Sequence, residues 1–106
     1  MITLKQGESY RIYLNLRQDG APLVPEKVED VKICIGSSWS KTYKGGGVMF
    51  DFTKNQWFIF PTQVETLAMK EGRFTICCHV KYPDSSVIIT DLDTVRIVKA
   101  CRGEVF

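Results

Sequence analysis

The segment from Tyr10 to Gln18 constrains the fold more than any other part of the chain, because its side chains alternate strictly. One face carries only aromatic or apolar residues, namely Tyr10, Ile12, Leu14 and Leu16. A period of two with one apolar face predicts a strand half buried against a core. Asp19 and Gly20 follow and suit the positive φ angles of a tight turn. The segment therefore predicts a β domain.

Similar strands recur to the C-terminus, separated by turns rich in Gly, Pro, Asn and Ser. The predicted strands are Thr3–Lys5, Tyr10–Gln18, Val31–Ile35, Trp39–Lys44, Val48–Phe52, Gln56–Phe60, Arg73–Tyr82, Val87–Asp91 and Asp93–Ala100. Trp39–Lys44 has a weak apolar pattern, so we expect it at a sheet edge. Gln56–Phe60 is apolar on both faces, which predicts either a central strand packed on both sides or a strand packed on a partner.

One short helix interrupts the strands. Thr62 and Glu65 fit a capping box and Gly72 fits a helix stop, which predicts a helix over about Gln63–Lys70. Its buried face would hold Val64, Leu67 and Ala68. Short strands at this spacing with a single crossing helix indicate an all-β protein whose sandwich contains about seven to eight strands. We expect one immunoglobulin-like antiparallel β-sandwich domain spanning residues 1–106.

Composition excludes several classes of function. Fourteen basic and twelve acidic side chains leave a net charge of +2, too small to predict nucleic-acid binding. No apolar run approaches the roughly 18 residues that a membrane helix needs. The N-terminal residues do not resemble a signal peptide, so we expect synthesis in a cytoplasm. The Gly45–Gly47 run is read as a hairpin turn, because a strand follows it where a phosphate-binding loop would need a helix.

The residues with catalytic or metal-binding chemistry are sparse. Without a secretion signal, Cys34, Cys77, Cys78 and Cys101 are expected to be free thiols. The only histidine, His79, shares a strand face with Cys77, about 7 Å away along the strand and beyond direct contact. Cys77 and His79 could bind metal with Cys34 or Cys101, but zinc ligands are usually paired at turns. We therefore predict no enzyme, no metal, no cofactor and no small-molecule substrate.

Edges, aromatics and chain ends offer surfaces for protein contacts. The first strand could pair with another chain, Tyr13 points outward, and the tail ends in two apolar residues. The candidate contact residues are Ile2, Leu4, Tyr13, Trp39, Tyr43, Val105 and Phe106. An alternative is a carbohydrate-binding module, in which Trp39 and Tyr43 would stack on sugar rings.

Four segments carry a resemblance to a known family. They are the opening Ile2–Tyr10, the turn Asp19–Leu23, the crossing Pro61–Leu67 with Glu71–Phe74, and the hairpin Tyr82–Val87. In these segments the chain resembles small immunoglobulin-like virion proteins of tailed bacteriophages, including the N-terminal domain of upper baseplate proteins. Ser85 stands where glycine is usual in that pattern, and the cysteines and the Gly45–Gly47 loop are additional.

The resemblance implies a non-enzymatic structural protein of the virion. Such a module would act through contacts with other virion proteins and with copies of itself, in a baseplate, tail, neck or capsid surface. It would be made in the host bacterial cytoplasm, with no nucleic-acid or membrane partner.

Overall fold

The computed structural model describes residues 1–106, and strands dominate it. The strands are β1 (Ile2–Lys5), β2 (Ile12–Leu14), β3 (Arg17–Gln18), β4 (Ala21–Pro22), β5 (Asp30–Ile35), β6 (Trp39–Thr42), β7 (Val48–Asp51), β8 (Gln56–Ile59), β9 (Gly72–Lys81) and β10 (Val87–Val98). A short 3-10 helix covers Pro25–Lys27 and one α-helix, α1, covers Gln63–Ala68. No helix is long and apolar enough to cross a membrane. The prediction of an all-β protein is confirmed.

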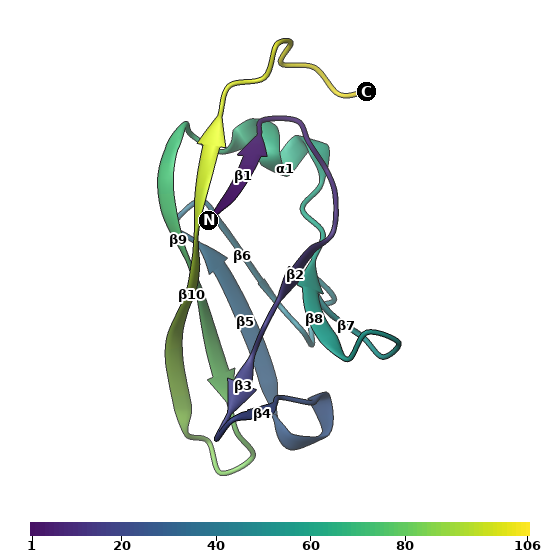
Figure 1. Cartoon of the computed structure of the whole chain (residues 1–106), viewed down its shortest axis with the longest axis vertical. Coiled ribbons are helices and arrows are strands. Elements are labelled where there is room, and N and C mark those ends of the chain that lie inside the picture. The colour runs from purple at the N-terminus through teal and green to yellow at the C-terminus, as the bar shows by residue number, and fades with distance from the viewer.

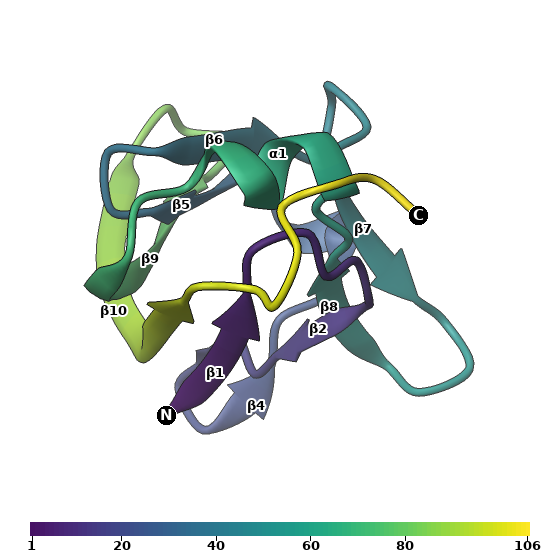
Figure 2. The same ribbon diagram turned by 90° about the horizontal axis from the view of Figure 1, so that it is seen from above.

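The strands form two main sheets and one small ribbon (Figure 1). The five-stranded sheet has the order β1-β10-β9-β5-β6, and the three-stranded sheet has the order β2-β8-β7. β3 and β4 pair only with each other. β1 is parallel to β10, whereas every other pair is antiparallel. Seen from above, the two main sheets stand on either side of the domain and α1 closes one end (Figure 2).

One hydrophobic core lies between the two main sheets. Its centre contains Ile33 of β5, Ile76 of β9 and Trp57 of β8, each at most 1% exposed. The Trp57 Nε1–H donates a hydrogen bond of 2.9 Å to the Leu23 carbonyl, so the indole is buried without losing its polar partner. The alternation read from the sequence thus places the inner faces of both sheets correctly.

Several local predictions are confirmed. Asp19 and Gly20 form the turn between β3 and β4 with φ angles of 51° and 80°. β6 is the edge strand and β8 the central strand, as their apolar patterns predicted. Thr62 and Glu65 make both hydrogen bonds of a capping box at the start of α1. α1 connects β8 of one sheet with β9 of the other, as expected for a crossing helix.

Two predicted strand boundaries are wrong. The segment Tyr10–Gln18 is divided, because β2 pairs with β8 while β3 leaves that sheet to pair with β4. The predicted pair Val87–Asp91 and Asp93–Ala100 is a single strand, β10, in which a bulge shifts the register between Asp91 and Asp93. A bulge keeps both halves on β9 while it bends the strand.

The buried face of α1 also differs from the prediction. Val64 is 67% exposed, whereas Thr66 and Met69 are buried. Polar groups of the loop after β1 explain the difference: the Thr66 hydroxyl donates to the Glu8 carbonyl at 2.8 Å and accepts from the Gly7 N–H at 3.0 Å. The helix therefore turns the Thr66 hydroxyl toward the domain, where it hydrogen-bonds two backbone groups of the partly buried loop.

Candidate functional site

Two of the predicted contact residues lie inside the domain. Leu4 is 1% exposed on the inner face of β1, and Trp39 is 6% exposed at the start of β6. Both belong to the hydrophobic core. Their side chains are therefore not available to a partner, because the strand alternation turns them inward.

The other predicted contact residues differ in exposure. Ile2 and Tyr43 are partly buried against the core, and the Tyr43 ring lies 5.1 Å from that of Trp57. Tyr13 is half-buried and its hydroxyl donates to Asp51 Oδ2 at 3.0 Å. Val105 and Phe106 are exposed at the chain end. The predicted residues do not gather into one surface.

The first half of β10 offers an exposed apolar surface that the sequence reasoning missed. Val87, Ile88 and Ile89 are 53%, 52% and 62% exposed. The sequence signal was present, because three consecutive apolar residues break the alternation that a half-buried strand requires. We call Val87–Asp91 the open segment of β10.

The open segment also has an unpaired edge. β9 pairs with β10 along nearly its whole length, but β1 pairs only with residues Val95–Val98 (Figure 1). β1 begins at Ile2, opposite Val95, so its pairing does not extend to the open segment. An unpaired edge presents backbone N–H and C=O groups that can pair with another strand.

A groove runs beside the open segment on the inner side of β10. It has a volume of 310 Å³ and lies between the β3 region and the strands β9 and β10. Leu16 and Leu23 line one side, and Val80, Ile88 and Leu92 line the other. Ile88 borders this groove, whereas Val87 and Ile89 lie opposite Lys81 and His79 on the outer face of the sheet, so the open segment exposes aliphatic side chains on both faces.

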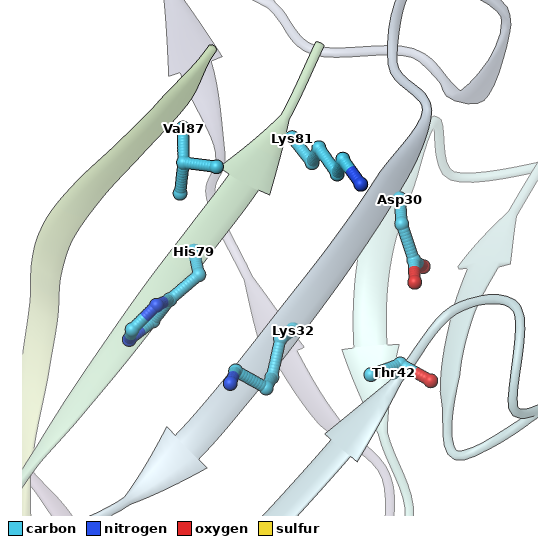
Figure 3. A pocket seen from close by; sticks show the side chains of 6 residues that line it. All are labelled: Asp30, Lys32, Thr42, His79, Lys81 and Val87. Atoms are coloured by element: carbon cyan, nitrogen blue, oxygen red, sulfur yellow. The ribbon is translucent and has the colours of Figure 1, made fainter. Parts of the chain in front are cut away.

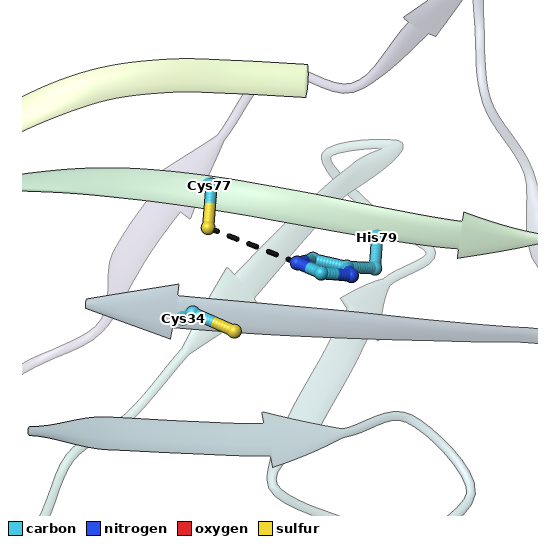
Figure 4. A group of neighbouring side chains, drawn as sticks. All are labelled: Cys34, Cys77 and His79. Carbon is cyan, nitrogen blue, oxygen red and sulfur yellow. Dashed lines mark hydrogen bonds between the residues drawn. The ribbon is translucent and has the colours of Figure 1, made fainter. Parts of the chain in front are cut away.

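A second group of side chains lies on the outer face of the five-stranded sheet. Cys34 of β5, Cys77 of β9 and His79 of β9 place their sulfur and nitrogen atoms within 4.8 Å of one another (Figure 4). Cys77 Sγ and His79 Nε2 are 4.0 Å apart. The expectation that strand spacing keeps these two apart is wrong, because the imidazole leans along the strand toward the thiol. All three side chains are half-buried.

The strand register explains why this cluster forms. Cys34 lies directly opposite Cys77 across β5 and β9, and His79 is two residues further along the same face. On the opposite side of β9, Asp91 pairs with Cys77. Burial, the neighbouring Cys34 thiol and the Asp91 carboxylate raise the pKa of Cys77. The next residue, Cys78, faces the core, where burial raises its pKa to about 12.

An open hollow of 230 Å³ adjoins the cluster on the same face of the sheet (Figure 3). His79 borders it together with Lys32, Lys81 and Asp30. The Asp30 carboxylate already accepts hydrogen bonds from the backbone N–H groups of Val31 and Lys44. Because the hollow is open to solvent and His79 lines it, solvent can reach the imidazole.

Neither a protein-family model nor a curated protein matches this sequence. Function is therefore inferred from the fold, the open segment of β10 and the Cys34–Cys77–His79 cluster.

Proposed function

We propose that this chain is a non-enzymatic structural protein of a bacteriophage virion, an assembly module that acts through protein–protein contacts. The unpaired open segment of β10 supports the role in protein–protein contacts, and the sequence resemblance alone supports the virion assignment. Long exposed apolar edges are normally covered or charged in soluble proteins, because they invite pairing with another chain. An edge that keeps three exposed aliphatic residues fits a protein whose partner covers it.

The strand order supports an immunoglobulin-like sandwich for this module. Immunoglobulin domains place strands B, E and D in one sheet and C, F and G in the other. Here β2, β8 and β7 take the order of B, E and D, while β5, β9 and β10 take the order of C, F and G. β6 then corresponds to C′, and β1 lies beside β10 as an added first strand. The inter-sheet disulfide of antibody domains has no counterpart, because all four cysteines are free.

We further propose that a second copy of the chain occupies the open segment, with other virion proteins as additional partners. Antiparallel pairing of two identical edges is self-complementary about a two-fold axis. Pairing centred on Ile89 would place the two Ile89 side chains opposite each other and Ile88 opposite Thr90 of the second copy. It would also place Asp91 opposite Val87, so that the two Asp91 carboxylates would not face one another.

The carbohydrate-binding alternative needs a row of exposed aromatic rings. Trp39 is buried and Tyr43 packs against Trp57, so these two residues do not form such a row. No observation favours this alternative over the assembly module.

The test is the molar mass of the protein by light scattering over a range of concentrations. We expect the mass to rise from monomer toward dimer as the concentration increases. Ile89→Lys should keep the protein monomeric, because a charge on the edge opposes strand pairing. Mass spectrometry of purified phage particles tests the virion assignment separately. We expect to find the chain in the particles, and its absence would contradict the assignment.

Val64→Lys is the matched control. Val64 is an exposed aliphatic residue on α1, at 67% exposure, and lies away from the open segment. This variant should associate like the original chain. A constant monomer mass at every concentration, or an equal loss of association in both variants, would refute self-pairing through β10.

A further inference from the structure

We propose that Cys34, Cys77 and His79 bind a Zn²⁺ ion on the outer face of the five-stranded sheet, with the fourth coordination position open to solvent. This inference does not depend on the proposed virion function. Two thiolates and one imidazole form a donor set that zinc accepts in proteins, and three protein ligands leave one position free.

The spacing of the three ligand atoms suits a tetrahedral ion. With zinc bonds of about 2.3 Å to sulfur and 2.0–2.1 Å to nitrogen, tetrahedral ligand atoms lie roughly 3.5–3.8 Å apart. Cys77 Sγ and His79 Nε2 are already 4.0 Å apart, and all three atoms lie within 4.8 Å. Small side-chain rotations therefore close the site without moving the strands.

The backbone holds the three ligands in place before metal arrives. Cys34 and Cys77 are direct cross-strand partners in a ladder that runs from Asp30–Lys81 to Ile35–Ile76. His79 lies on the same strand as Cys77, with the side chains of both on the outer face. A site built on paired strands loses little conformational entropy when it binds.

The surroundings of the cluster are compatible with a bound cation. Cys34 Sγ lies 3.7 Å from the Ser40 hydroxyl, which can donate to a thiolate as a supporting partner. Asp91 lies opposite Cys77 and Lys32 lies opposite His79, so one carboxylate and one ammonium group flank the cluster. The hollow beside His79 gives the ion an entry path from solvent.

The test is a zinc titration of the reduced, metal-free protein against a chromophoric chelator, with reductant present so that Cys34 and Cys77 cannot form a disulfide. We expect one zinc ion per chain. Cys77→Ser and His79→Gln should each weaken binding more than about tenfold, because each removes a direct ligand. Cys101→Ser is the matched control, since Cys101 is a free, exposed thiol in the tail, and it should bind zinc like the original chain.

A second measurement keeps the test independent of how the variants fold. Cobalt added to the original chain should give the intense thiolate-to-cobalt absorption band and the visible bands of a tetrahedral site. No stoichiometric zinc binding by the original chain would overturn the proposal. So would cobalt spectra without thiolate ligation, or an equal loss of binding in Cys101→Ser.

Discussion

The two halves of β10 belong to one strand and pair with the same neighbour, yet they have opposite surroundings. Val95 and Ile97 are at most 2% exposed, because β1 covers the second edge of the strand there and the core covers the inner face. Ile88 and Ile89 are more than half exposed, because Ile88 borders the groove where β1 does not pair and Ile89 lies opposite His79 on the outer face. Equally aliphatic residues thus stabilise the fold in one half and remain available for contacts in the other.

The difference extends to the two ends of the domain (Figure 1). The end with Ile97 also holds α1 and the loop after β1, joined by the hydrogen bonds of Thr66. The other end holds the β9–β10 turn, the β3–β4 ribbon and the apolar groove. Core residues such as Leu23 and Val80 lie at this end too, so we infer that only its exposed residues can change at little cost in stability.

The largest expected effect is a difference in the free energy of unfolding between variants in the two halves of β10. Ile97→Ala should lower the free energy of unfolding by about 2–5 kcal/mol, because it removes buried methyl groups and leaves a cavity beside Leu4. Ile89→Ala should change it by no more than about 0.5 kcal/mol, because the side chain is largely in water. Chemical denaturation measures both. Similar losses in the two variants would contradict the comparison.

The sequence predicted the α1 end of the molecule better than the open end. Alternation identified the inner faces of β5 and β9, and Thr62 with Glu65 located the start of α1. Alternation reports only which face of a strand is buried. It could not show that β1 stops short of Val87, because the length of pairing depends on another segment of the chain.

The candidate sites could be predicted only in part for the same reason. Cys77 and His79 were recognised as sharing a face, but the contribution of Cys34 depends on the register between β5 and β9. One residue of slip would turn Cys34 to the core. Edge strands predict that Leu4 and Trp39 contact a partner, but both side chains belong to the hydrophobic core. Strand register and the burial of individual edge residues depend on contacts between distant segments, which a local sequence pattern does not report.

A smaller effect tests the hydrogen bonds that join α1 to the loop after β1. Thr66→Val keeps the shape of the side chain but leaves the Gly7 N–H and the Glu8 carbonyl without this partner. We expect a loss of about 1–3 kcal/mol in the free energy of unfolding, because two partly buried hydrogen bonds are lost and each contributes about 0.5–1.5 kcal/mol. Thr90→Val is the matched control in the exposed half of β10 and should be nearly neutral. Equal effects would mean that Thr66 only fills space.

The smallest effect should appear in acid, at one carboxylate from each end of the molecule. Partial burial of Glu65 favours a higher pKa, but hydrogen bonding from the Thr62 N–H and the ion pair with Lys41 outweigh it and lower the pKa below 4.5. Hydrogen bonds from Ser86 lower the pKa of Asp84 below 3.8. Each lowered pKa adds stability that is complete above the unfolded value and is lost as the pH falls through the folded value.

Glu65 should dominate this loss, because its bonds join α1 to β6, whereas Asp84 bonds only to a residue two positions away. Such local bonds contribute less to global unfolding, since opening of the exposed turn can break them alone. Glu65→Gln should therefore be less stable than the original chain at neutral pH, with the gap closing as the pH falls below 4.5. Asp84→Asn should show a smaller gap. Denaturation midpoints of the original chain and both variants, measured across this pH range, give the two stability differences. A larger difference for Asp84→Asn than for Glu65→Gln would place the acid-sensitive stability at the open end.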